Sequence, residues 1–388
     1  MRGGEEMDEI VTEMRWENYF LRRGIDFKKY WKEFLTSKQR DVCYILGLGF
    51  DPRMCSAIEY VMKCNGDGIR DCYLIKFNEG ETSPSKKYEP QIAENEKKLT
   101  EIVSDRGRVI PKEIEMISSD RRRIGGRTII KCFNDVDFSK YSDIIVDISA
   151  LPRPLYFPVI RKFLHEFDEK QKNGQQKFNL HVVVVENPKL DSRIKALGVE
   201  DKADYIVGFR GRVELESTGN LPTVWIPVLG EGKAIQLEKI HTLVGPQEIC
   251  PVLPFPAMNP RRGDDIIIEY REMLFDNLRI DPVNILYASE QNPFEVYRKI
   301  VRTVSQYHRT LDVLGGCKIV VSILSSKLLS MGALLAVYDI SEDLQPKIPI
   351  AIAHVENQGY ELDPFDRDEI MKHEELYSMW LAGECYDD

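Results

Sequence analysis

The sequence predicts an α/β protein: two tandem Rossmann-like, doubly wound units with mostly parallel sheets, preceded by an N-terminal amphipathic helical segment. Short apolar runs that end in turn residues alternate with stretches of helical periodicity, which is the pattern of βα units. The order of these runs in the first half of the chain recurs in the second half. The length of 388 residues also exceeds the roughly 100–200 residues of one ordinary domain, so we expect two domains.

The composition indicates a globular protein outside the membrane. Hydrophobic residues make up 43% of the chain and charged residues 30%. No apolar run approaches the ~20 residues of a membrane-spanning helix. The N-terminal residues are acidic and lack the apolar core of a secretory signal, so we expect a cytoplasmic protein.

Charge and cysteine spacing argue against several classes of ligand. The net charge of −10 disfavours binding along a long nucleic acid, which needs a concentrated basic surface. The eight cysteines form no CxxC pair and no Cys/His cluster of zinc-site spacing. We therefore expect no metal, no disulfide framework and no cofactor.

The first segment, residues 1–40, is expected to be a helical cap or docking segment. Its aromatic residues recur at spacings of three and four among charged residues, which is typical of an amphipathic helix. Packing against the chain's own first domain is the favoured interpretation, and a docking surface for a partner is the alternative. The aromatic residues are Trp16, Tyr19, Phe20, Phe27, Tyr30, Trp31 and Phe34.

Residues 41–215 are expected to form the first Rossmann-like domain. Strands are predicted at 42–48, 72–77, 128–133, 143–148 and 180–185, and helices at 88–103 and 155–167. A polar insert at about 105–126 separates them. It contains the basic run Arg121–Arg123, for which a solvated loop is favoured over a phosphate contact.

Residues 216–362 are expected to form the second Rossmann-like domain, followed by an acidic tail at 363–388. The second domain has predicted strands at 224–229, 250–255, 319–324 and 350–355, and predicted helices at 294–307 and 328–338. Landmarks of the first domain recur here in order, about 170 to 180 positions later. For example, Arg153 corresponds to Lys327, and Glu186-Asn187 to Glu356-Asn357. We interpret this as duplication.

Ligands of open parallel sheets bind outside the carboxyl ends of the strands, so the loops after the first and fourth strand of each half are the candidate sites. The first-strand loops combine flexible glycines with a cation at a helix start, where exposed N–H groups attract anions. Neither loop is a GxGxxG or GxxxxGK[ST] motif, and a tight turn without a ligand is the alternative. The candidates are Gly47, Gly49, Phe50, Asp51 and Arg53, with Gly230, Gly232 and Lys233 in the second half.

The fourth-strand loops each place donors and a cation at a helix start, which suits a phosphate or carboxylate. A helix N-cap for Ser325 and a surface position for Arg153 are the alternatives. The candidates are Ser149, Leu151 and Arg153, with Ser325, Ser326 and Lys327 in the second half. The polar pairs that close the last predicted strand of each half, Glu186-Asn187 and Glu356-Asn357, complete the set.

The loops 49–53, 149–153 and 325–327 resemble those of the CRISPR-associated Rossmann fold sensors and related domains of prokaryotic defence systems. The resemblance covers most of residues 41–360. It implies that the loop after the first strand and a Ser/Thr–Lys loop at a later helix start contact the ligand. It also implies that two such domains pair around a cyclic oligonucleotide. No recognisable effector domain follows, which favours a sensing subunit that signals to a partner.

We therefore expect a sensor or regulatory subunit that binds a nucleotide or another phosphorylated ligand, with a protein partner or a second copy. Two alternatives stay open: a nucleotide-processing enzyme and a ligand-free scaffold subunit. The sequence has no GxSxG elbow and no HExxH motif, and no catalytic residue is assigned. His181 and His354 lie in or at the end of apolar strands, where a core histidine is the commoner outcome.

Overall fold

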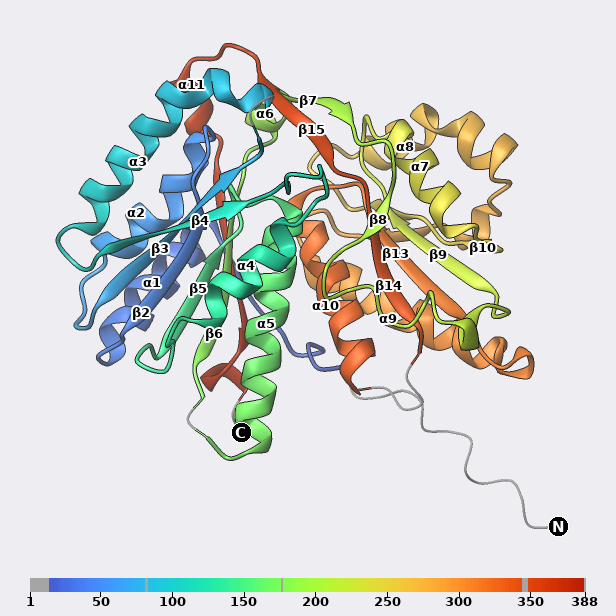
Figure 1. Cartoon of the computed structure of the whole chain (residues 1–388), viewed down its shortest axis with the longest axis horizontal. Helices are drawn as coiled ribbons and strands as arrows, with labels where there is room; N and C mark the ends of the chain where they lie inside the picture. The colour runs from blue at the N-terminus through green and yellow to red at the C-terminus, as the bar shows by residue number, and fades with distance from the viewer. Residues whose placement is uncertain (1–13, 81–82, 176, 344–347, 387–388) are drawn as a thin grey trace. The chain divides into compact units, whose positions relative to one another are not determined.

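The computed structural model describes residues 14–80, 83–175, 177–343 and 348–386. It is a mixed α/β protein in which the chain divides into two units (Figure 1). The first unit contains residues 19–198 and returns at 357–388. The second contains residues 199–356 together with the segment that ends at Asn18. Within the described residues, no helix is both long and apolar enough to span a membrane.

The first unit is built on a seven-stranded sheet with the order β1-β16-β6-β5-β2-β3-β4. Strands β2 to β6 are parallel, β16 is antiparallel to β6, and β1 is antiparallel to β16. The chain proceeds from β2 outward through β3 to β4, and then resumes at β5 on the other side of β2. The strands are β1 (Phe20–Arg23), β2 (Val42–Gly47), β3 (Arg70–Asn78), β4 (Val109–Glu115), β5 (Asp143–Asp147), β6 (Asn179–Glu186) and β16 (Glu375–Ala382).

Helices cover both faces of this sheet because its parallel strands are apolar on both sides. Alternate residues such as Tyr44 and Leu46 face α1 (Gly24–Ser37), α2 (Ser56–Lys63) and α3 (Glu89–Val103). The residues between them point to the opposite face of the sheet, which is covered by α4 (Gly125–Asn134) and α5 (Arg153–Lys172). These two helices lie side by side in Figure 1. On that face Tyr73 contacts Phe133, with ring centroids 6.4 Å apart.

The second unit has a sheet of order β12-β11-β9-β13-β14-β8, with β10 also paired to β9. All pairings are parallel except that of β14 with β8. The strands are β8 (Asp204–Tyr205), β9 (Thr223–Val228), β10 (Glu248–Ile249), β11 (Val252–Pro254), β12 (Leu286–Ala288), β13 (Lys318–Ile323) and β14 (Ile350–His354). The helices are α7 (Ala234–Val244), α8 (Arg262–Glu269), α9 (Pro293–Thr310) and α10 (Lys327–Asp343). Helices α7 and α8 share one hydrophobic core with the sheet.

The C-terminal segment, expected to be an acidic tail at 363–388, instead belongs to the first unit. After the short helix α11 (Arg367–Met371), β16 pairs along its length with β6 and contributes buried side chains such as Leu376 and Met379. Trp380 packs its ring against Phe34, with centroids 5.1 Å apart. Acidic residues flank β16, and for this reason this apolar strand of eight residues was not predicted from the sequence.

The N-terminal segment also differs from the continuous helix that its aromatic spacing predicted. Residues 20–23 form β1, and the helix α1 spans Gly24–Ser37. Trp16 lies in a turn that belongs to the second unit, where its ring contacts Tyr297 edge-on at 5.5 Å. The remainder of the predicted segment, residues 1–13, lies outside the described residues. Tertiary pairing of β1 with β16 overrides the local helical spacing.

One predicted strand, 128–133, is a helix. It forms most of α4, because Ile129 and Phe133 are four residues apart and bury the same helix face. The third strand of the parallel series is β4, which lies in the stretch expected to be a polar insert. Pro111 and three charged residues in β4 are compatible with its position at the sheet edge.

The chain passes between the units near 198 and 356, not near the predicted limits of 215 and 362. At these points β7 (Ile194–Val199) and β15 (Asn357–Leu362) form a two-stranded sheet. The backbone N–H of Asp363 donates to the carbonyl of Arg193 at one end. Because β15 returns the chain to the first unit, that unit is discontinuous in sequence.

The core of the first unit encloses a histidine. The His181 ring is fully buried against Trp31, Phe34 and Trp380, with ring centroids 4.9 to 5.1 Å away. Neither ring nitrogen has a hydrogen-bond partner among the described atoms, and the Asp143 carboxylate lies 3.9 Å from Nε2. Burial lowers the pKa of His181 well below its ordinary value, and the nearby Arg40 adds to this effect.

We predict that the first unit loses stability as pH falls below about 6.5. The unfolded state protonates His181 in that range while the buried ring stays neutral, so stability is present above the unfolded pKa and declines below it. Between pH 7.5 and 5.5 the loss from this group is up to about 1.4 kcal/mol. Urea unfolding at both pH values should show a smaller decline for His181→Phe than for the wild type. An equal decline in both would contradict the assignment.

Candidate ligand site at the carboxyl ends of the strands

In each unit the candidate loops gather where the strand order reverses. In the first unit the reversal lies between β2 and β5, whose residues Leu46 and Asp147 pair across the sheet. In the second it lies between β9 and β13, where Val228 pairs with Ile323. The loops that leave these strands at their carboxyl ends are therefore neighbours, and this is the place where open α/β sheets bind ligands.

In the first unit, the loops after β2 and β5 approach each other closely at Gly47. A Cβ at Gly47 would lie 2.8 Å from Leu151 Cδ2 and 3.2 Å from the carbonyl oxygen of Ala150. Leu151 is fully buried, so its side chain fills the space beside the end of β2. Gly49 is different, because its nearest neighbour would be 4.0 Å away. Leu151 is thus a packing residue that fixes the separation of the two loops.

Arg53 is held by carboxylates of its own unit. Its Nη2 lies 2.7 Å from Asp51 Oδ2, and its Nη1 lies 2.8 Å from Asp191 Oδ1, at the end of α6 (Pro188–Asp191). The side chain is buried. Burial alone would lower the pKa of Arg53, but the two carboxylates outweigh it and raise the pKa. Arg53 was expected to offer a cation to a ligand, and in the structure it joins the β2 loop to α6.

Ser149 and Asn187 also hold loops together. The Ser149 hydroxyl accepts the backbone N–H of Val185 at 2.9 Å, and its own N–H donates to Asp147 Oδ1 at 2.9 Å. Asn187 is buried; it caps α6 by accepting the Leu190 N–H and donates to the Ile370 carbonyl at 2.9 Å. Both residues were predicted ligand contacts; in the structure the Ser149 hydroxyl joins β5 to β6, and the Asn187 side chain joins the end of β6 to the segment before β16.

The other first-unit candidates lie on the accessible side of this framework. Arg153 is the first residue of α5 and is half-buried, as is Glu186 at the end of β6. Phe50 stacks on Tyr88, with ring centroids 4.6 Å apart. Gly49, Phe50, Arg153 and Glu186 thus keep partial solvent exposure.

The second-unit loops touch in the same way. A Cβ at Gly230 would lie 2.7 Å from the Leu324 carbonyl oxygen and 3.0 Å from Ser325 Cα. Ser326 accepts the Leu329 N–H at 3.2 Å and caps α10, whose first residue is Lys327. The N-cap alternative considered for Ser325 thus applies to its neighbour. Ser325 is buried beside Gly230, while Ser326 and Lys327 are half-buried.

Two residues at the end of α8 accept backbone N–H groups at the start of α7. Neither was predicted from the sequence. The Gly232 N–H donates to Glu269 Oε1 at 2.8 Å, and Gly232 has a φ of +69°, which favours glycine. The Lys233 N–H donates to the Tyr270 hydroxyl at 2.7 Å. That hydroxyl in turn donates to the Gly230 carbonyl at 2.6 Å. A carboxylate thus occupies the backbone donor that was expected to face an anionic ligand.

Arg262 is a second residue that the sequence did not single out. It binds Glu231 through two bonds, from Nε at 2.6 Å and from Nη2 at 2.8 Å, and it also contacts Glu290 after β12. Burial raises the pKa of Glu231, but the Arg262 guanidinium outweighs it, and the net pKa is lowered. This bridge ties the β9 loop to the loops after β11 and β12.

The last predicted pair, Glu356 and Asn357, lies at the junction of β14 and β15. The Glu356 carbonyl accepts the Glu200 N–H at 2.9 Å. Asn357 begins β15, and its side-chain amide donates to the Tyr360 hydroxyl at 3.2 Å. The matching tripeptide Val-Glu-Asn in the two halves therefore marks different local structures.

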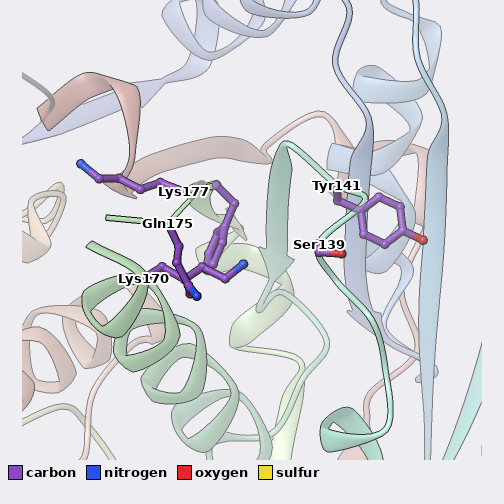
Figure 2. Close-up of a pocket in the computed structure, with 6 residues that line it drawn as sticks. Ser139, Tyr141, Lys170, Gln175 and Lys177 are labelled. Carbon is purple, nitrogen blue, oxygen red and sulfur yellow. The ribbon is translucent and has the colours of Figure 1, made fainter. Parts of the chain in front are cut away.

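A cavity of about 350 Å³ lies at the other end of the first sheet (Figure 2). Its lining includes Lys170 near the end of α5, Lys177 just before β6, and Ser139 and Tyr141 on the loop before β5 (Figure 2). Lys170 lies over the Phe178 ring, 5.1 Å from its centroid. This cavity is at the amino ends of β5 and β6, so it is separate from the candidate loops.

The comparisons with known proteins add no relative: the sequence matches no protein-family model, and no curated protein matches it significantly.

We predict that Gly47→Ala destabilises the first unit while Gly49→Ala does not. The added methyl at position 47 would overlap Leu151, and overpacking of this kind costs about 1–3 kcal/mol. Position 49 has room for a Cβ, so it is the matched control. Urea unfolding measures both. Equal stability of the two variants would mean that the loops are not packed as described.

Proposed function

We propose that this protein is a sensor or regulatory subunit that binds a nucleotide or another phosphorylated ligand and signals to a protein partner. One observation carries the proposal. In each unit a glycine after the first parallel strand lets the loop after the fourth strand approach, at the reversal of strand order. This brings main-chain N–H groups and the cations Arg153, Lys233 and Lys327 to the end of the sheet that binds ligands.

We further propose that the two units are related copies. Counted within each unit, and leaving out the two-residue β10, the parallel strands follow the same order, 3-2-1-4-5, and an antiparallel strand lies beside the fifth in both sheets. Gly47 and Gly230 meet the following loops at the same place in this order. These correspondences support duplication more strongly than the tripeptide Val-Glu-Asn. The proposed resemblance to tandem ligand-sensing Rossmann domains of antiviral defence rests on this arrangement.

Under this proposal Glu269 is a placeholder for the anionic group of the ligand. It is exposed, and its carboxylate accepts the Gly232 N–H at the start of α7. An entering phosphate would accept the Gly232 N–H and lie at the positive end of the α7 helix dipole, and the Glu269 side chain would then move into solvent. The exchange gives the site two states that differ in the contact between α7 and α8, as a switch requires.

A thermal-shift screen with cyclic and linear oligonucleotides and with mononucleotides tests ligand binding. A ligand at a hundred times its dissociation constant adds about 2.7 kcal/mol to the folded state, which raises the melting temperature by several degrees. We expect Arg153→Ala or Lys327→Ala to reduce the shift, measured for each variant against its own ligand-free melting temperature. Unchanged shifts in both variants would place the ligand elsewhere. Chromatography of the incubated ligand separates binding from turnover.

We predict that Glu269→Gln binds the phosphorylated ligand more tightly than the wild type. The amide keeps the shape of the side chain and an acceptor for Gly232, but it removes the charge that competes at the helix start. Helix-terminal charge effects of about 0.3–1 kcal/mol correspond to a roughly two- to fivefold gain in affinity. Isothermal titration measures the change, with the exposed Glu238→Gln on α7 as a control. Weaker binding by Glu269→Gln would show that Glu269 contacts the ligand instead.

A further inference from the structure

Three large apolar side chains are exposed on β12 and on the segment that follows β11. Phe255 is 55% exposed, Tyr287 44% and Met258 67%. The Phe255 and Tyr287 rings meet edge to face, with centroids 6.1 Å apart and planes at 77°. Single exposed apolar residues are ordinary on a protein surface, but an aromatic pair with an adjoining methionine is a typical feature of binding surfaces.

Strand register places the aromatic pair on a definite face. Tyr287 pairs with Leu253 across β11 and β12, and Leu253 belongs to the core beneath α7 and α8. Side chains alternate along a strand, so Tyr287 points to that same face, and Phe255, two residues after Leu253, follows it. The aromatic pair therefore lies on the face of the sheet that α7 and α8 cover, past the first residue of α8.

A continuous set of polar contacts links this pair to the glycine loop after β9. The Phe255 N–H donates to the Ala288 carbonyl at 2.7 Å. The Met258 N–H donates to Glu290 Oε2 at 2.8 Å. Glu290 contacts Arg262, and Arg262 binds Glu231, which stands between Gly230 and Gly232. The aromatic pair and the phosphate-accepting loop are thus two parts of one rim.

We propose that Phe255 and Tyr287, with Met258, form the subsite for the base of a nucleotide whose phosphate binds at Gly230–Lys233. The proposal rests on the proposed function and adds the class of ligand: a nucleotide, as opposed to a phosphorylated sugar or an inorganic anion. A base presents a flat apolar face that exposed rings can stack against. The Glu231–Arg262–Glu290 bridge beside the rings supplies acceptors and donors for the polar edge of the base.

The geometry favours a base over a protein segment as the occupant. The exposed rings are few, and the segment after Phe255 is joined through Glu290 and Arg262 to the β9 loop, so a few polar groups lie between the rings and that loop, as in a small-ligand site. β12 is only three residues long and offers little backbone for pairing with an added strand. A nucleotide anchored by its phosphate at the loop needs only the rings to complete its contacts.

The test measures binding of AMP, GMP, CMP and UMP to the full chain by isothermal titration, with ribose 5-phosphate as the probe that lacks a base. The proposal expects at least one nucleotide to bind more tightly than ribose 5-phosphate. Phe255→Ala should weaken that nucleotide roughly 5- to 100-fold and leave ribose 5-phosphate unchanged, because stacking contributes about 1–3 kcal/mol per base. Phe255→Trp keeps a ring and should retain the affinity.

Val313→Ala is the matched control, since Val313 is 89% exposed and lies before the amino end of β13. Equal affinities for nucleotides and ribose 5-phosphate, or nucleotide binding unaffected by Phe255→Ala, overturn the base subsite while the phosphate site stands. Failure of every probe to bind the second-unit loop, with Lys233→Ala indistinguishable from wild type, overturns both. Loss of self-association in Phe255→Ala, with no change in nucleotide binding, assigns the rings to a protein interface and also overturns the subsite.

Discussion

The close approach of two loops at each reversal of strand order is the constraint on which the rest of the structure depends. Gly47 and Gly230 occupy positions where any Cβ would meet the neighbouring loop, at 2.8 Å and 2.7 Å. Without a side chain at these positions, the loops after the first and fourth strands come into contact. This contact aligns the starts of α5 and α10 with the first-strand turns. A larger residue would separate the very groups that the candidate site requires.

In each unit, a charged residue at the candidate site forms ion pairs with other residues of the same unit. Arg53 is taken up by Asp51 and Asp191, and Arg262 by Glu231 and Glu290. Such partly buried pairs have their charges largely satisfied within the protein, so they stabilise loop geometry more than they attract ligands. Main-chain N–H groups at helix starts are a further source of attraction for an anion. This favours a ligand that contacts several weak groups at once over a single tightly held ion.

Most of the parallel strands, though not β4, β10 or β12, could be predicted from the sequence because they are apolar runs with turn residues after them. β2, β5, β6, β9, β13 and β14 all begin or end within two residues of their predicted limits. β4 and β16 were missed because proline or flanking acids conceal strands that tertiary pairing stabilises. Residues 128–133 were assigned to a strand from β-branched content, although burial of Ile129 and Phe133 selects a helix. The loops of the candidate site were located, but Glu269 and Arg262 were not, because their partners lie over 25 residues away in the sequence.

The return of the chain to the first sheet has a consequence for biosynthesis. β16 lies between β6 and β1, yet the ribosome makes it only after the whole of residues 199–356. Until then β6 exposes an unpaired edge, and β1 has no neighbour in the sheet. The later-made unit can therefore finish folding while the earlier one waits, which reverses the usual order of domain folding during translation.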